Sequence, residues 1–443
     1  MLNQEEGQEL ITQALRLSRA DDVQVNLEGI TSAHLRFARN SPSTSGNYSD
    51  HSLTIKSSFG KKSASATVNQ LDAASVKEVV ERSEQLARLA PDNPEHLPGL
   101  GPQQFAAVSA YDPTLLERAG EEMAAGSGLC IERARELGLV AAGFSEASAY
   151  GSWIGNRRGL IGYHRTTQVG FSETARTSGG DGSGWACGVG NASKSIDYAR
   201  CSAVAIDKAQ RSAQPRPLAP GKYVTILEPA CVASLMQLLL FSMSARSADE
   251  GRSYFSEPGG KNKLGQKLFP ESVTITSDPG SSVAPGAPWG EGGLPQKPRT
   301  WIQRGRLESL FYERFWAEKQ GREAVPAPSN LLMAGGSGSL EDLIASTERG
   351  VLITSLWYIR FVDPKSLLLT GLTRDGVFWI ENGKLAYPVT NFRWNDSPVR
   401  VLQNVEAMTA SARASTREST ATNISVPALR VKEFELSSVS DAV

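Results

Sequence analysis

Histidines are the first side chains to search for chemistry, because a catalytic or metal-binding imidazole needs partners at a defined spacing. The chain has only His34, His51, His96 and His164. None belongs to an H-x-H or H-E-x-x-H pattern, so no pair is placed on one helical face to bind zinc. The histidines therefore predict no local catalytic or metal site.

Motifs for a nucleophile or for phosphate binding are also missing from the sequence. No G-x-S-x-G nucleophile elbow occurs, and residues 260–267 lack the Lys-Ser/Thr pair that would reach phosphate and Mg²⁺. The four cysteines show no C-x-x-C spacing. Cys187 and Cys231 are interpreted as small core residues, because no base is visible near them that could activate a thiol.

The composition is that of a globular chain with no strong electrostatic field. Its 443 residues exceed one ordinary core and predict two or three domains. Lys and Arg total 46 against 47 Asp and Glu, so we expect no direct nucleic-acid or membrane partner. The N-terminus lacks a signal-peptide pattern, and unpaired cysteines suit a reducing compartment, which together predict a cytoplasmic location.

The order of periodic segments predicts an α+β fold in three parts. Residues 1–95 contain a helix, several alternating strands and a second helix, which indicates an N-terminal α+β domain. A Pro- and Gly-rich linker leads into a middle helix–strand unit over residues 96–215. Residues 216–443 are predicted to form a β-rich C-terminal domain that includes one helix over 231–247.

Several segments of the C-terminal half resemble the TldD/PmbA family in order and in motif. Residues 379–389, WIENGKLAYPV, are similar to the family's I-E-N-G-K…P-V hairpin, and their Asn-Gly pair favours a type I′ turn. Residues 328–333 (PSNLLM), 348–353 (ERGVLI) and 426–431 (VPALRV) resemble neighbouring family segments. The first 210 residues are similar in element order more than in motif. The resemblance implies the TldD/PmbA fold.

The resemblance also indicates where the family holds its metal. In the metal-bearing subunit type, TldD, an H-E-x-x-x-H motif follows a strand similar to residues 221–229, and a later Cys is the third ligand. Here Phe241 and Arg246 stand at the histidine positions and Ser242 at the glutamate position, and no Cys follows Cys231. Phe has no lone pair and Arg stays protonated. The chain thus resembles the TldE type, with no catalytic residue or metal of its own and with zinc in a partner subunit.

The residues around this motif carry two further expectations. Phe241 and Met243 are expected to pack in a core helix. Four neighbours are expected to form a charge cluster, on a solvated face or at an interface, with the solvated face favoured: Arg246, Asp249, Glu250 and Arg252. The candidate substrate or interface residues are Phe241, Ser242, Arg246, Trp357, Tyr358 and Arg360. The alternation over residues 357–361 also suits an ordinary strand with a buried and an exposed face.

The resemblance implies a subunit of a heteromeric zinc metallopeptidase that processes peptides and small unfolded proteins with a TldD-like partner. An extended peptide would add to a sheet edge of this chain through backbone hydrogen bonds. Alone, the chain is expected to be inactive and able to form a homodimer. One alternative is a non-enzymatic homodimer that binds peptides or modulates another complex, which the family's other label, modulator of DNA gyrase, favours. Another is a component of peptide natural-product maturation.

Overall fold

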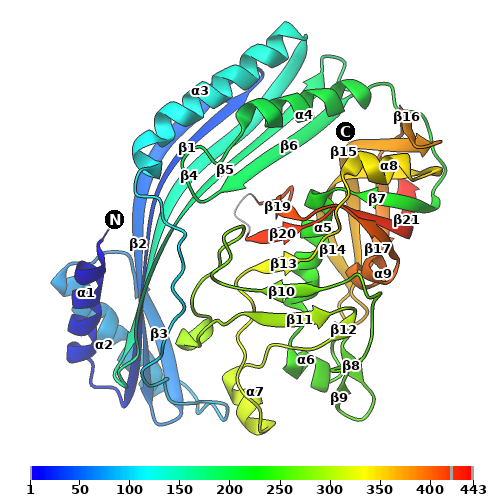
Figure 1. The fold of residues 1–443 in the computed structure, drawn as a ribbon. Coiled ribbons are helices and arrows are strands. Elements are labelled where there is room, and N and C mark those ends of the chain that lie inside the picture. The colour runs from blue at the N-terminus through cyan, green and yellow to red at the C-terminus, as the bar shows by residue number, and fades with distance from the viewer. Residues whose placement is uncertain (1, 420–422, 441–443) are drawn as a thin grey trace.

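The computed structural model describes residues 2–419 and 423–440 and confirms the predicted α+β class. A long curved sheet forms one side of the molecule, and a β-rich C-terminal body forms the other (Figure 1). No helix in these two ranges is long and apolar enough to cross a membrane.

The N-terminal half is built on one antiparallel six-stranded sheet in the order β3-β2-β1-β4-β5-β6. Its strands are β1 (Asp22–Ala38), β2 (Ser41–Phe59), β3 (Lys62–Val68), β4 (Leu139–Asn156), β5 (Ile161–Thr177) and β6 (Ser183–Gly190). Strand β1 pairs with β4 from Gln24 opposite Asn156 to Phe37 opposite Gly143. The linker expected near residue 95 therefore connects two parts of one sheet.

Helices cover one face of this sheet. They are α1 (Gln4–Leu17), α2 (Ala73–Leu89), α3 (Leu115–Glu136) and α4 (Tyr198–Arg211). Side chains alternate between the two faces of a strand, and odd-numbered residues of β1 enter both helix-covered cores. Val25 and Leu27 pack in the core of α1 and α2, whereas Phe37 packs in the core of α3 and α4. The opposite face looks toward the C-terminal body (Figure 1).

Two larger sheets form the C-terminal body. The first has the order β12-β11-β10-β13-β20-β19, with β10 (Ile275–Ser277), β11 (Arg299–Gln303), β12 (Arg306–Leu307), β13 (Leu331–Met333), β19 (Ala412–Ala414) and β20 (Ile424–Val426). The second comprises β7 (Gly221–Leu227), β14 (Arg349–Asp363), β15 (Leu368–Glu381), β16 (Lys384–Pro388), β17 (Phe392–Asp396), β18 (Val405–Met408) and β21 (Leu429–Val439). It closes into a ring, because β14 pairs with both β7 and β15 while β17 and β21 complete the circle.

The remaining elements are short or lie between these sheets. They are α5 (Pro229–Phe241), α6 (Ala245–Asp249), α7 (Arg314–Lys319), α8 (Leu340–Ala345), α9 (Pro398–Gln403), the 3₁₀ turn Glu291–Gly293, and the paired strands β8 (Ser256–Glu257) and β9 (Lys261–Asn262). Helix α5 is apolar on nearly all sides and is mostly buried in the main core of the body, as such a helix must be.

The single helix predicted over residues 231–247 is wrong, because the chain breaks it after Phe241. The Ser242 hydroxyl donates to the carbonyl oxygen of Leu239 at 2.7 Å, and the Ser244 side chain caps the start of α6 by accepting from the Ser247 backbone N–H. Serine hydroxyls that bind nearby backbone groups compete with helix continuation. Two serines therefore separate α5 from α6.

The hairpin predicted at Asn382-Gly383 is confirmed. Both residues have positive φ angles, 50° and 74°, as a type I′ turn requires. Glu381 pairs with Lys384 across the turn, at the start of the β15–β16 ladder. The turn residues alone were sufficient to locate this hairpin.

Candidate functional site

Phe241 is the last residue of α5, and it projects into solvent. Its side chain is 80% exposed, whereas Met243, two residues later, is fully buried. The expected core packing is therefore confirmed for Met243 and wrong for Phe241, which lies on the solvent-facing side of the C-terminal end of α5. An aromatic ring left in water at this point is free to contact another molecule.

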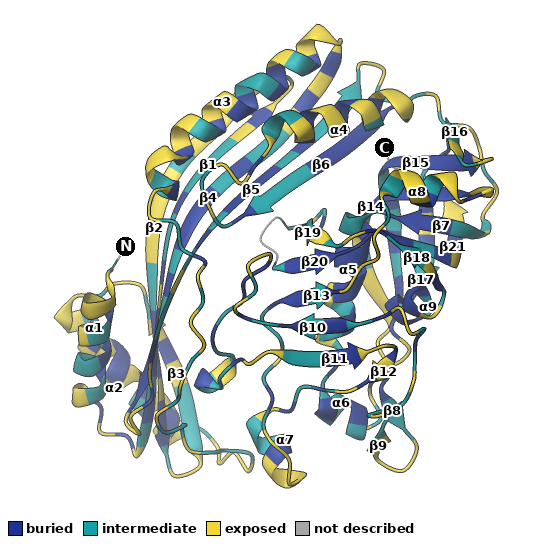
Figure 2. Ribbon diagram, in the orientation of Figure 1, coloured by how far each residue is buried: buried dark blue, intermediate teal, exposed yellow. Residues whose placement is uncertain are grey.

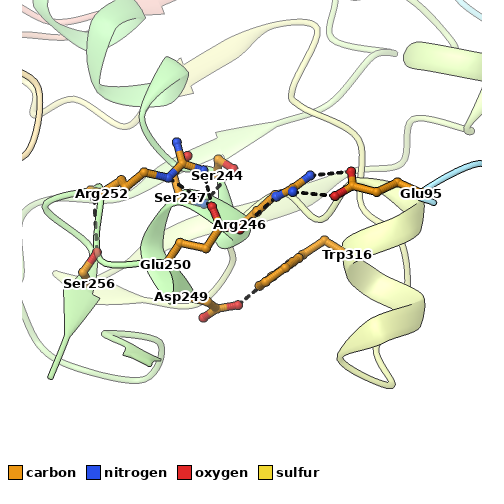
Figure 3. Close-up of polar contacts among 10 residues, drawn as sticks. Glu95, Ser244, Arg246, Ser247, Asp249, Glu250, Arg252, Ser256 and Trp316 are labelled. Carbon is orange, nitrogen blue, oxygen red and sulfur yellow. Dashed lines mark hydrogen bonds and ion pairs between the residues drawn. The ribbon is translucent and has the colours of Figure 1, made fainter. Parts of the chain in front are cut away.

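Arg246 connects α6 to the linker that leaves the N-terminal half of the chain (Figure 3). Its Nη1 and Nη2 donate to the two carboxylate oxygens of Glu95, each at 2.7 Å, and its Nε donates to Glu250 at 3.1 Å. Arg252 also pairs with Glu250. A two-pronged guanidinium–carboxylate contact fixes geometry as well as charge. The expected charge cluster thus includes a contact between the C-terminal body and the linker, made by Arg246 and Glu95. Arg252 lies on the solvent-exposed side of the cluster.

Trp316 of α7 supports this cluster from the C-terminal body. The Arg246 guanidinium lies 5.4 Å from the Trp316 ring centroid, and the indole N–H donates to Asp249 at 2.7 Å. Nearby, Arg314 donates to the carbonyl oxygen of Pro98 at 2.8 Å. Two arginines of the body therefore hold the same linker.

The side chains at the motif positions do not suit a divalent cation. Phe241 offers no lone pair, the Ser242 hydroxyl is donated to a backbone carbonyl, and Arg246 carries a fixed positive charge already paired with carboxylates. Burial raises the pKa of all four cysteines, that of Cys187 to about 11, which opposes thiolate ligation. Within residues 2–419 and 423–440, no group of three or more His, Cys, Asp or Glu side chains could hold a metal ion.

The other candidate residues lie on the second half of β14. Tyr358 has a φ of 55° at a point where the β14–β15 register shifts, and such a bulge re-aims a side chain. Its ring is half exposed, and the Arg360 guanidinium stacks 4.2 Å from the ring centroid. Trp357 is partly buried, with Arg374 at 5.6 Å and Arg417 at 5.8 Å from its ring.

The two sets of candidate residues form separate groups. Among the described residues, no hydrogen bond, ion pair or ring contact joins Phe241, Ser242 or Arg246 to the β14 group. Beyond Ile353, which pairs with Leu227, β14 has no strand partner on its β7 side in the described ranges. The body therefore presents an exposed aromatic at the end of α5 and, separately, an aromatic and cationic strand edge.

A buried polar cluster that the sequence analysis missed joins the N-terminal sheet to the body. Asp375 is fully buried and accepts from Ser183 of β6 at 2.7 Å and from Arg417 at 2.8 Å. Arg417 also donates to Thr174 of β5 and lies 5.2 Å from the Trp185 ring centroid. Asp375 and the next residue, Gly376, have positive φ. An Asp-Gly pair is a turn signal, and it was the one available hint.

Loss of the Arg246–Glu95 contact is expected to loosen the linker. In Arg246→Met, backbone amide hydrogen exchange at Glu95, His96 and Gly99 should speed up roughly two- to fivefold at neutral pH, the range of a partly exposed ion pair. The control is Lys267→Met, which removes an exposed pair with Glu271 elsewhere in the body. Unchanged exchange in Arg246→Met would contradict a tethering role.

The same contact should depend on pH. The hydrogen bond from Arg246 lowers the pKa of Glu95. The contribution of the Arg246–Glu95 contact to stability is therefore complete above the ordinary glutamate pKa of about 4.3. It is lost as the pH falls through the lower pKa that Glu95 has in the folded state. The difference in exchange between wild type and Arg246→Met should vanish only in acid.

Comparison with known proteins adds an independent finding. Residues 220–438 match the PmbA/TldA metallopeptidase C-terminal domain. The chain belongs to the PmbA/TldD family. It is 24% identical over 358 residues to Metalloprotease PmbA of Escherichia coli O157:H7, an alignment that covers 77% of each chain. The resemblance stated from the C-terminal motifs is thereby confirmed.

Solved structures of low sequence identity share the fold. TldE from Thermococcus kodakarensis matches 97% of this chain and 99% of its own, with a TM-score of 0.86 and 17% identity. A proposed modulator of DNA gyrase from Thermotoga maritima matches 97% of this chain and 99% of its own, with a TM-score of 0.84 and 16% identity. The predicted PmbA/TldD-like architecture is therefore confirmed over nearly the whole chain.

Proposed function

We propose that this PmbA/TldD-family chain is the subunit of a heteromeric metallopeptidase that binds no catalytic metal itself. A TldD-like partner would supply the zinc and the hydrolytic chemistry. The observation that carries the proposal is what the side chains at the three motif positions do. Phe241 points into solvent, the Ser242 hydroxyl donates to a backbone carbonyl, and Arg246 forms an ion pair with Glu95. Each is chemically unfit to ligate zinc or to activate water.

The chain's own contribution would be surface for the partner and for the peptide. Strand β14 supports the second role, because it has no strand partner on its β7 side beyond Ile353 in the described ranges. After a buried run over residues 354–356, its far end is solvent-exposed and carries Tyr358 and Phe361. An extended peptide can pair with such an edge through backbone hydrogen bonds, which tolerate varied side chains. Trp357, Tyr358 and Arg360 would then contact peptide side chains next to that edge.

The exposed ring of Phe241 would serve the contact between subunits. Interface anchors are typically aromatic side chains that fill a pocket of the partner. The four unpaired cysteines suit a reducing compartment, and we place the assembly in the cytoplasm on that ground.

Co-expression with a TldD-like subunit tests this function. We expect the two chains to copurify and an unfolded peptide substrate to be cleaved by the mixture, while this chain alone leaves it intact. Cleavage by this chain alone would overturn the proposal. Failure to copurify, with no gain of cleavage in the mixture, would favour instead a non-enzymatic homodimer that binds peptides.

A further inference from the structure

The far end of β14 is exposed and carries arginines on its aromatic side chains. Other strands of the body are mostly buried, as Figure 2 shows for β13 and β20, whereas β14 is exposed over residues 360–363. The guanidinium of Arg360 stacks on the Tyr358 ring. Those of Arg374 and Arg417 lie against Trp357. Positive charge is therefore concentrated beside the part of β14 that lacks a strand partner on its β7 side.

Arg374 has no counter-charge of its own. Arg417 next to it is paired, because its Nε donates to Asp375 at 2.8 Å. Within residues 2–419 and 423–440, the Arg374 side chain makes no ion pair, and its Nε is buried without a hydrogen-bond partner. Burial lowers the pKa of Arg374 most, and the like charge of Arg417 lowers it further, against the opposing effect of Asp375. A partly desolvated cation in this position is stabilised by an incoming anion.

A carboxylate of the chain itself marks a place where such an anion can bind. Glu418 accepts a hydrogen bond from the backbone N–H of Tyr358 at 3.1 Å. Tyr358 lies where the β14–β15 register shifts, and this N–H is turned to the Glu418 carboxylate. Glu418 is exposed and forms no ion pair in the described part of the chain. A single solvent-exposed hydrogen bond holds this carboxylate, so another carboxylate can replace it.

We propose that the far end of β14 selects peptides that carry a carboxylate, which replaces Glu418 at the Tyr358 N–H and pairs with Arg374. The carboxylate belongs to an acidic side chain or to the C-terminal end of the peptide. Hydrogen bonds between a guanidinium and a carboxylate are stronger than those between neutral groups. The inference rests on the proposed peptide-binding role of β14. Backbone pairing alone accepts any extended peptide, and the arginine adds a preference for acidic ones.

A peptide is favoured over a nucleic acid as the occupant. Arginines on aromatic rings also suit single-stranded nucleic acid. The backbone N–H of Tyr358, however, belongs to a strand beside which an extended peptide can lie, and the group it already binds is a carboxylate. The whole chain is also nearly neutral, with 46 basic and 47 acidic residues, so no broad positive field would follow a phosphate backbone.

The preference is tested by fluorescence anisotropy of the full chain with three forms of one short, unfolded peptide, labelled with a neutral dye. The first has a central Glu and a C-terminal amide, the second a central Gln and a free C-terminal carboxylate, and the third a central Gln and a C-terminal amide. At least one carboxylate form should bind about tenfold more tightly than the neutral form, the scale of one charge-assisted hydrogen bond. The form that does so identifies the source of the carboxylate. Added salt should reduce the preference.

Variants assign the preference to Arg374 and Glu418. Arg374→Gln should lose the preference and keep the affinity for the neutral peptide, which shows that the variant is folded. Arg374→Lys should keep part of the preference because it keeps the charge. Glu418→Gln should bind the carboxylate peptide about threefold more tightly, because the competing charge is gone. The control, Arg304→Gln, removes an exposed arginine that pairs with Glu271 elsewhere in the body and should behave as wild type.

The outcomes separate this inference from the proposed function. Equal affinity for the three peptides, or a preference that survives in Arg374→Gln, would overturn the inference and leave peptide binding by β14 in place. Tighter binding of a short oligothymidylate than of the carboxylate peptides would also overturn it. Binding of none of the three peptides would overturn it together with the peptide-binding role of β14. Peptide cleavage by this chain alone contradicts only the assignment of zinc to a partner.

Discussion

Replacing Asp375 by alanine is expected to lower the free energy of unfolding by about 3 kcal/mol, the scale observed when one partner of a buried ion pair is removed. Asp375 is fully buried and accepts from Arg417 and Ser183. Without the carboxylate, the Arg417 guanidinium, whose side chain is 19% exposed, loses its counter-charge. The cluster links β5 and β6 to the closed ring of the body, so the loss should also weaken the join between the two halves.

Asp375→Asn is the matched variant for this prediction. Asparagine tolerates the positive φ of 58° at this position and keeps an oxygen that can accept from Ser183. It removes the charge and places an amide NH2 group where the carboxylate accepted from Arg417. Because it adds no backbone strain, its loss of stability should still be smaller than that of alanine. Urea unfolding measures both values. Midpoints that equal the wild-type midpoint for both variants would show that the cluster does not stabilise the join.

Replacing Phe241 by alanine is expected to weaken association with the TldD-like partner roughly 30-fold, the effect of losing one aromatic anchor. The free energy of unfolding should not change, because the ring is 80% exposed and packs little within the chain. Titration of labelled partner with each variant gives the dissociation constant, and thermal unfolding verifies stability.

Leu89→Ala is the control for Phe241→Ala. Leu89 is an equally exposed apolar residue, 83%, but it ends helix α2 on the N-terminal half. Its replacement should leave association unchanged. If the two variants bind the partner alike, Phe241 is not part of the interface, and its exposure is that of an ordinary surface residue.

Elements with a local periodic signal were predictable from the sequence, and exposed strands were not. Helices α2, α3 and α4 each bury one apolar face, which gives the periodic pattern from which a helix can be predicted. The first half of β2 was missed: residues 41–50 are polar and open on both faces, so they show no alternation. Strand β1 cannot be recognised as one continuous strand from its sequence, because Gly29, Thr31 and Ser32 interrupt its apolar pattern.

The candidate site divides in the same way. The unsuitability of positions 241, 242 and 246 for zinc could be predicted from the sequence, because it depends only on residue type and on order along the chain. The contact between Glu95 and Arg246 joins residues far apart in sequence, and Glu95 sits in a Pro-rich linker that carries no signal for it. The exposure of Phe241 depends on a helix break made by serine hydroxyls, which an apolar periodicity cannot reveal.

The most direct test of the account is the zinc content of each purified subunit, measured by mass spectrometry after gel filtration in metal-free buffer. This chain alone should carry no stoichiometric zinc, and the TldD-like partner should carry one ion per chain in the cleaving mixture. One tightly held zinc per copy of the isolated chain, together with peptide cleavage by that preparation, would contradict it.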